Sequence, residues 1–193
     1  MRKILAVAVA LILALAAMSA LADAAEAPGT SQNFGDFTLT YPDTCSLDLG
    51  EKTSDSVYFT LFSTATSGEN FANNLNCVWT KEYEDLSQYE PQDLLDFTVS
   101  NFASNAAAEG LTVTNVQPLK AEKIHIGGKE ALAIGYSYDA DYSNLGLNLQ
   151  ASLYCMSVSV SDPALGIYTF SVTSANQEGL MELANVLDTL VWN

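Results

Sequence analysis

Positive charge is scarce in this chain. Seven Lys and Arg residues stand against 23 Asp and Glu residues in 193, which gives a formal net charge of −16. Nucleic-acid binding depends on Lys and Arg side chains that neutralise phosphates, so this composition argues against a nucleic-acid partner. Hydrophobic residues make up 49% of the chain, a share that argues against intrinsic disorder and is enough for one folded domain.

Histidine is almost absent, because His125 is the only one. A single imidazole excludes metal sites and catalytic groups that need several histidines. His125 lies between Ile124 and Ile126 in a strand-like run, and if those two side chains point inward, His125 points into solvent. We therefore expect a surface residue rather than a metal ligand or a base. The sequence also lacks a Gly-x-Ser-x-Gly motif and a glycine-rich phosphate loop.

Long hydrophobic runs are also rare, and the one present lies near the start. The run from Ile4 to Met18 follows Arg2 and Lys3 and precedes several small residues. This layout is typical of a secretory signal peptide, with cleavage after Ala22 or, as an alternative, after Ala24. The run is short for a membrane span of about 20 residues. No cysteine stands near the cleavage point, so a lipid anchor is not expected.

The chain is therefore predicted to consist of three parts. Residues 1–22 form a signal peptide, residues 23–33 a flexible leader, and residues 34–193 a single domain. The mature protein is expected to be secreted or extracytoplasmic, without stable membrane insertion. Its acidity predicts weak attraction to anionic lipid surfaces.

Cysteine is sparse, with Cys45, Cys77 and Cys155 as its only occurrences. In an exported protein, one disulfide plus one free thiol is expected, and the sequence does not choose among the three pairings. The alternative is that the thiols are small buried hydrophobic groups. Their spacing matches no zinc motif, and a catalytic thiol would have only one imidazole to serve as its base.

Alternating apolar and polar residues predict strands in two groups. The first is a meander of three strands before residue 80, and the second follows a helix. Along the strand after residue 147, the apolar parity changes at Met156, which predicts either a β-bulge or a changed burial pattern. Gly127-Gly128 predicts a hairpin turn. The strand-like runs are 37–41, 57–62, 75–79, 111–116, 123–126, 132–138, 147–160 and 168–172.

Two amphipathic helices are predicted. The first covers about residues 90–109, begins near Pro91, and ends at Gly110. Its apolar stripe consists of Leu95, Val99, Phe102 and Ala106. The second has a stripe that runs from Leu180 to Val191. The order of strands and helices predicts an α+β fold in which an antiparallel sheet of six to seven strands is flanked by helices, as an α/β/α sandwich.

Five segments follow one another in an informative order, namely Phe37–Pro42, Asn73–Val78, the helix over 89–109, Gly128–Ala131 and Val186–Trp192. In this order they resemble the PsbP/Mog1 superfamily, including its bacterial DUF1795 and LpqN-like members. The resemblance covers about residues 34–193. One departure is that Asp43-Thr44-Cys45 stands where many members have a Trp.

The resemblance implies a fold and a class of function, but it transfers no site. Members of this superfamily serve as photosystem II accessory subunits, as Ran-binding factors, or as exported bacterial proteins of unclear role. No catalytic, cofactor-binding or metal-binding residue is carried over to this sequence. The resemblance therefore implies a non-enzymatic domain without a cofactor.

Three groups of residues could carry chemistry, and each has a simpler interpretation. Asp139-Ala140-Asp141-Tyr142-Ser143 resembles the start of a calcium loop, but Asn144 and Gln150 replace its expected Gly and Glu, so a polar hairpin turn is favoured. The acidic stretch could hold a carboxylate pair for acid–base catalysis, although a solvated loop and helix start explains it. The stretch consists of Glu82, Glu84, Asp85, Glu90, Asp93 and Asp96.

The third group consists of tyrosines in the second half of the chain. Tyrosine is favoured at interfaces, but ordinary sheet packing is the simpler explanation. The group is Tyr136, Tyr138, Tyr142, Tyr154 and Tyr168.

We therefore expect an exported binding or accessory domain that acts on a protein partner. The alternatives are a cell-surface hydrolase that uses carboxylates and a calcium-stabilised module.

Overall fold

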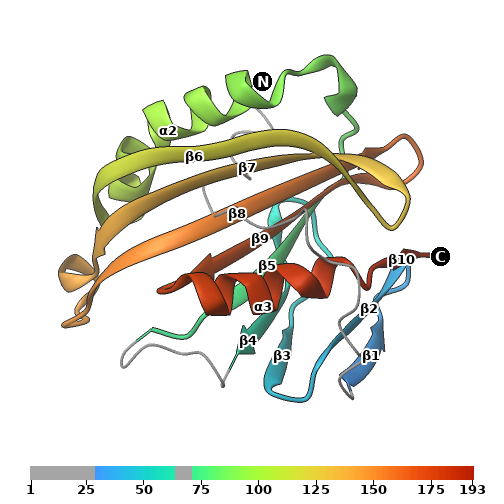
Figure 1. Cartoon of the computed structure of the whole chain (residues 1–193), viewed down its shortest axis with the longest axis horizontal. Helices are drawn as coiled ribbons and strands as arrows, with labels where there is room; N and C mark the ends of the chain where they lie inside the picture. Colours follow the sequence, from blue (N-terminus) through green and yellow to red (C-terminus); the bar gives the residue numbers. More distant parts are fainter. Residues whose placement is uncertain (1–28, 64–70) are drawn as a thin grey trace.

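The computed structural model describes residues 29–63 and 71–193, and Figure 1 shows how their elements are arranged. Two α-helices and two short 3-10 helices accompany the strands in these ranges. The helices are η1 (Leu86–Gln88), α2 (Pro91–Ala108), η2 (Ser143–Leu145) and α3 (Gln177–Leu187). The strands are β1 (Gly29–Asn33), β2 (Phe37–Pro42), β3 (Cys45–Leu49), β4 (Ser56–Ser63), β5 (Asn74–Thr80), β6 (Thr112–Ile126), β7 (Lys129–Asp141), β8 (Gln150–Asp162), β9 (Gly166–Ser174) and β10 (Val191–Trp192).

The main sheet has seven strands in the order β3-β4-β5-β9-β8-β7-β6, and every pair of neighbours is antiparallel. The predicted α+β architecture is therefore confirmed. The Gly127-Gly128 turn also forms the predicted hairpin between β6 and β7. Its two glycines have φ values of +54° and +82°, which fit a tight turn that demands positive φ at both central positions.

Helix α2 covers one face of the sheet, over β6 and β7. Its Phe102 ring packs against Tyr136 and Tyr138 of β7, with ring centroids 5.0 and 4.7 Å apart. Leu95, Phe102 and Ala106 of the predicted stripe are buried, as amphipathic spacing requires.

The opposite face is covered by α3 and by a second sheet, in which β2 lies between β1 and β10. The two faces can be separated by strand register. Tyr136 pairs with Cys155, and Cys155 pairs with Thr173, so these three side chains share the α2 face. Phe170 is three residues from Thr173 and points to the other face, where its ring meets Phe37 of β2 at 5.5 Å.

A polar cluster joins the two sheets beside these rings. Asp36, in the β1–β2 turn, accepts hydrogen bonds from Lys52 and from the Tyr168 hydroxyl. The Lys52 ammonium also lies 4.6 Å from the centre of the Trp79 ring. Burial alone would raise the pKa of Asp36, but the bonds from Lys52 and Tyr168 and the Lys52 charge lower it. The carboxylate is thus held in its charged form between the sheets.

The predicted front meander is wrong in its first strand. Residues 37–41 belong to β2 in the second sheet, whereas the meander of the main sheet is β3-β4-β5. The five-residue β3, Cys45–Leu49, was not predicted, although its apolar and polar residues alternate as in a strand; it is a short, mostly exposed strand at the edge of the main sheet. Part of the predicted leader is also wrong, since Gly29–Asn33 forms β1 and pairs with β2. β1 forms through backbone pairing with β2, and its sequence did not predict a strand because its side chains are polar and do not alternate with apolar ones.

In the second half of the fold, two predictions are corrected, and the alternatives at Met156 are decided in favour of a changed burial pattern. Residues 112–126 form one long strand, β6, with irregular pairing near Val116 and Leu119, whereas two separate strands, 111–116 and 123–126, were predicted. The parity change at Met156 reflects burial on both faces, because the pairing of β8 with β7 and with β9 shows no register shift. Helix α3 ends at Leu187, so Leu190 and Val191, the last two residues of the predicted apolar stripe, lie outside the helix, and Val191 belongs to β10.

The predicted disulfide is wrong, since Cys45, Cys77 and Cys155 are all free. Cys77 lies on β5 and Cys155 on β8, and β9 separates the two strands. Strands two positions apart are about 9.6 Å from each other, which exceeds the span of a disulfide. Cys45 on β3 is likewise two strands from Cys77. Burial raises the pKa of the Cys45 thiol to about 11, with a further contribution from the charge of Glu182.

The predicted signal peptide, residues 1–22, lies outside the described residues. Within the described ranges, neither α-helix is long and apolar enough to cross a membrane.

Candidate functional site

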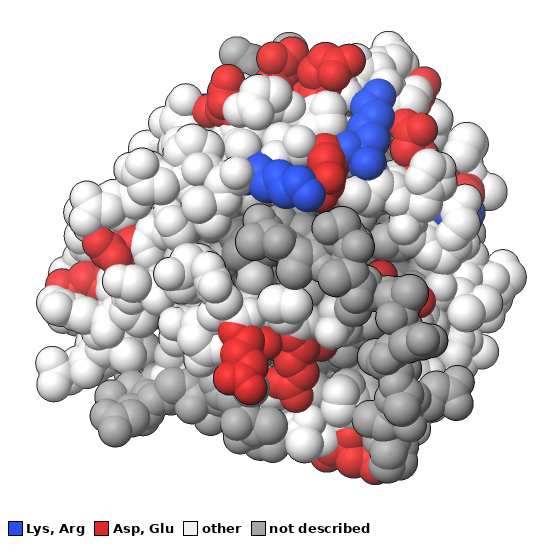
Figure 2. All heavy atoms as spheres, in the orientation of Figure 1, with Lys and Arg blue, Asp and Glu red and all other residues white. Residues whose placement is uncertain are grey.

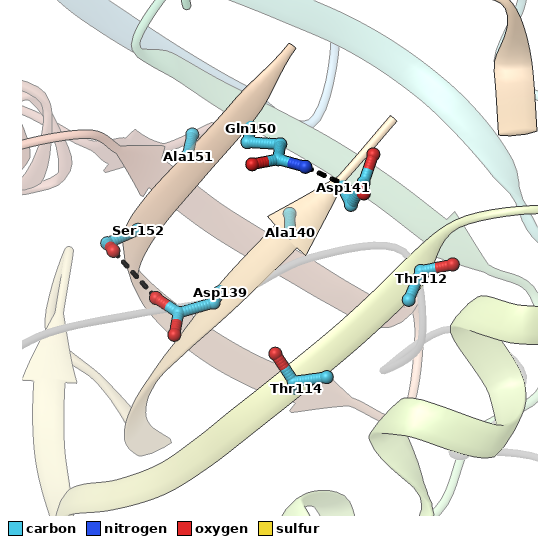
Figure 3. A pocket seen from close by; sticks show the side chains of 8 residues that line it. All are labelled: Thr112, Thr114, Asp139, Ala140, Asp141, Gln150, Ala151 and Ser152. Atoms are coloured by element: carbon cyan, nitrogen blue, oxygen red, sulfur yellow. Dashed lines mark hydrogen bonds between the residues drawn. The ribbon is translucent and has the colours of Figure 1, made fainter. Parts of the chain in front are cut away.

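A polar hollow of about 430 Å³ lies on the face of the main sheet opposite α2, where β7 ends and its neighbours β6 and β8 begin (Figure 3). Two residues from each strand supply its polar lining. Because side chains at alternate positions share a face, each strand contributes residues two apart. The polar lining residues are Thr112 and Thr114 of β6, Asp139 and Asp141 of β7, and Gln150 and Ser152 of β8.

Strand register sorts these six residues into two parallel rows. Thr114 pairs with Asp139, and Asp139 pairs with Ser152. Two residues further along β7, Asp141 pairs in the same way with its neighbours Thr112 and Gln150. Each row therefore places a carboxylate between a threonine and a second neutral polar side chain. We call this arrangement the two-row surface.

Asp139 is a fixed hydrogen-bond acceptor in the first row. One carboxylate oxygen accepts from the Ser152 hydroxyl at 2.6 Å, and the other accepts from the Asn115 amide at 2.6 Å. These two bonds stabilise the charged form, so they lower the pKa of Asp139 below its ordinary value. Asn115 reaches the carboxylate from an irregular part of β6, where its own φ is +53°.

Asp141 is held in a similar way in the second row. Its Oδ1 accepts from the backbone N–H of Ser143 at 2.8 Å, and its Oδ2 accepts from the Gln150 amide at 2.9 Å. Hydrogen bonds from Ser143 and Gln150 lower the pKa of Asp141. Asn144, in η2, donates to the Thr112 hydroxyl at 3.0 Å and ties the hairpin tip to β6. The rows are thus pre-organised by the chain's own bonds.

The resemblance of residues 139–143 to a calcium loop is not matched by a ligand cluster. Asp139 and Asp141 lie in β7, and all four of their carboxylate oxygens accept hydrogen bonds. Among the described residues, no group of three or more His, Cys, Asp or Glu side chains is placed to hold one metal ion. The segment is the end of a strand followed by the polar hairpin turn that the sequence favoured.

The acidic stretch does not converge on one site. Asp85 caps η1 by accepting from the Ser87 N–H at 3.0 Å, and Asp93 lies in the first turn of α2, where the helix dipole favours it. Asp96 accepts from the Gln92 side chain at 2.7 Å, and Glu84 bonds the Tyr89 hydroxyl. These contacts match the predicted solvated loop and helix start.

The remaining sequence candidates have structural roles or none. His125 is exposed on β6, as predicted. Tyr136, Tyr138 and Tyr168 are buried in the core, which favours ordinary sheet packing over an interface for these three. Tyr142 and Tyr154 are half-buried.

Basic side chains in the described ranges are mostly committed to neighbouring acids. Lys52 pairs with Asp36, and Lys129 pairs with Asp162. Lys120 and Lys123 lie 2.6 and 4.0 Å from glutamate oxygens. Figure 2 shows acidic side chains in several separate groups on one face, with the few basic side chains close to acidic ones. The protein therefore offers negative charge to a partner and little positive charge.

A second hollow, of about 380 Å³, lies between η1 and the other ends of β7 and β8. Its lining mixes the Lys129–Asp162 pair with Asp85, Glu130 and the exposed ring of Tyr83. Lys129 pairs with Asp162, which leaves Asp85 and Glu130 as the remaining charged groups of the lining, and both are negative.

Sequence reasoning found Asp139 and Asp141 but missed their neutral partners. The signal was available in part, because Thr112, Thr114 and Ser152 all stand at alternate positions in predicted extended runs. Their alignment with the two aspartates depends on the register of β6 and β8 against β7. Periodicity gives the face of a side chain, but it does not give the neighbour across the sheet.

The fold is that of PsbP and Mog1 structures. Cyanobacterial PsbP from Synechocystis sp. PCC 6803 matches with a TM-score of 0.58 and 10% identity, over 91% of this chain and 99% of that one. The Ran-binding protein Mog1p of Saccharomyces cerevisiae matches with a TM-score of 0.52 and 10% identity, over 86% of this chain and 95% of that one. LpqN of Mycobacterium tuberculosis, described as involved in cell envelope biogenesis, matches with a TM-score of 0.49 and 19% identity, over 85% of this chain and 90% of that one.

This chain therefore has a PsbP/Mog1-like fold, and the resemblance noted in the sequence is confirmed at the level of fold. No protein-family model and no curated protein sequence matches it.

Proposed function

We propose that this chain is an exported, non-enzymatic binding domain that acts through a protein partner at the cell envelope or outside the cell. The observation that carries this proposal is the two-row surface, where Asp139 and Asp141 are fixed as charged groups on an open sheet face. Export is supported by the signal-like sequence of residues 1–22. The PsbP/Mog1-like fold supports a binding role, since Mog1p is itself a Ran-binding protein.

The alternative of a carboxylate-dependent hydrolase has less support at this site. A general acid must keep its proton near neutral pH, which requires a raised pKa. Hydrogen bonds lower the pKa of both Asp139 and Asp141, so these two carboxyl groups are poor proton donors. They are suited instead to attract and orient a positive group of a partner.

Affinity capture tests the proposed function. The mature chain, residues 23–193, is immobilised and exposed to the cell envelope fraction and culture medium of its own source, and retained proteins are identified by mass spectrometry. We expect one protein to be retained in excess over a column carrying an unrelated acidic domain. The purified candidate should then bind the mature chain directly in calorimetry. If no retained protein binds directly, the proposed function is wrong.

A further inference from the structure

The spacing of the two rows is a recognition feature in its own right. Asp139 and Asp141 are two residues apart on β7, so their Cα atoms are separated by about 6.8 Å along the strand. Alternate side chains of any extended segment repeat at the same distance and point to the same side. An extended partner segment that lies along β7 would therefore match the two carboxylates with its residues i and i+2.

The chemistry of the rows specifies the matching residues. Each carboxylate already accepts two hydrogen bonds and stays charged, and each oxygen retains capacity for a further donor. The donors that gain most from a fixed carboxylate are ammonium and guanidinium groups. Thr112 and Thr114 on one side, and Gln150 and Ser152 on the other, add neutral hydrogen-bonding groups on both flanks.

We propose that the two-row surface binds an extended segment of a protein partner that carries Lys or Arg at alternate positions. This rests on the proposed function, because it specifies the chemistry of the partner at the same site. Charge complementarity favours this partner, because two positive side chains match the two carboxylates of Asp139 and Asp141. None of the ion pairs described above involves Asp139 or Asp141, so the lysines within the described ranges leave both carboxylates available. The net charge of −16 would also speed the approach of a positive segment.

The test compares two peptides of identical composition. One is N-acetyl-Thr-Lys-Thr-Lys-Thr-amide, with lysines at alternate positions, and the other is N-acetyl-Thr-Lys-Lys-Thr-Thr-amide, with adjacent lysines. Each is titrated into isotopically labelled mature chain at low ionic strength, and backbone amide shifts are followed by NMR. We expect the alternating peptide to bind about fivefold more tightly, since it forms both ion pairs where the other forms one. The largest shifts should lie at Asp139, Asp141 and their neighbours in the two rows.

A pair of charge-matched variants provides the control. The double variant Asp139→Asn and Asp141→Asn should remove the preference for the alternating peptide. The double variant Asp93→Asn and Asp96→Asn loses the same charge from exposed positions on α2, on the opposite side of the sheet, and should keep the preference. Amide spectra of both variants check that the fold is retained.

Two outcomes would overturn the proposal. One is equal affinity for the two peptides, and the other is equal weakening by both double variants, since either would mean that only overall charge attracts the peptide. The proposed function is tested separately by the captured protein. If that protein binds the mature chain and the Asp139→Asn/Asp141→Asn variant equally well, the binding role stands and this surface is not the site.

Discussion

Replacing Phe37 with alanine should lower the free energy of unfolding by about 3–5 kcal/mol, as truncation of a fully buried phenylalanine does. Phe37 has no exposed surface, and its ring centroid lies 5.1–5.5 Å from those of Phe34, Tyr168, Phe170 and Trp192. It therefore connects β2 of the small sheet to β9 of the main sheet and to the end of the chain. Urea unfolding followed by tryptophan fluorescence measures the change.

Leu119→Ala is the control for this prediction. Leu119 is also apolar but is 48% exposed on the edge strand β6, so its truncation should cost less than about 1 kcal/mol. If Phe37→Ala were no more destabilising than Leu119→Ala, the second sheet would not be packed on the main sheet as described. Since whole domains are stable by about 5–15 kcal/mol, the expected loss at Phe37 could unfold much of the protein.

Replacing Gly166 with alanine should cost at least about 3 kcal/mol, because two effects add at this position. Gly166 begins β9 with φ of +91°, a conformation that residues with a Cβ rarely adopt. A Cβ there would also lie 2.3 Å from the backbone oxygen of Thr80, which cannot move without breaking the pairing of β5 with β9. Thermal and urea unfolding of the variant provide the measurement.

Gly128→Ala separates these two effects. Gly128 has a similar φ, +82°, but a Cβ there would meet nothing within 4 Å. This control should therefore show only the backbone cost, about 1–2 kcal/mol. Equal losses for the two variants would contradict the close approach of Thr80 to the start of β9.

The sequence predicted elements well where side chains alternate against a core. Helix α2 begins at Pro91 and ends within two residues of the predicted limit, and the glycine hairpin lies where it was expected. These elements depend on local chemistry, namely a proline in the first turn and two positive φ values.

What the sequence did not predict depends on contacts between distant segments. Gly29–Asn33 has no apolar face and becomes a strand only because β2 offers an edge to it. Phe37–Pro42 looks like any amphipathic strand, and its packing with Trp192, far along the chain, places it in the second sheet. The free cysteines follow from strand order in the same way, because β9 inserts between the strands that carry Cys77 and Cys155. Strand order is a global property that local patterns do not encode.

The candidate site shows the same division. Asp139 and Asp141 could be chosen from the sequence as acidic neighbours at alternate positions. The lowering of their pKa values could not be predicted from the sequence, because the hydrogen-bond donors Asn115, Ser152 and Gln150 come from other parts of the chain. Whether these two aspartates act as proton donors or as fixed charges therefore depends on the register of β6, β7 and β8, which the sequence alone does not give.

The carboxyl titration of Asp139 and Asp141 is the most direct test of the central claim that both act as fixed charges. Carbon NMR of the labelled side chains follows each group as the pH is lowered. Hydrogen bonds stabilise the charged forms, so both midpoints should lie below the ordinary aspartate value of about 3.9, and both groups should stay ionised down to that pH. A midpoint above about 5 for either residue would contradict the account and would favour a proton-donating role at this surface.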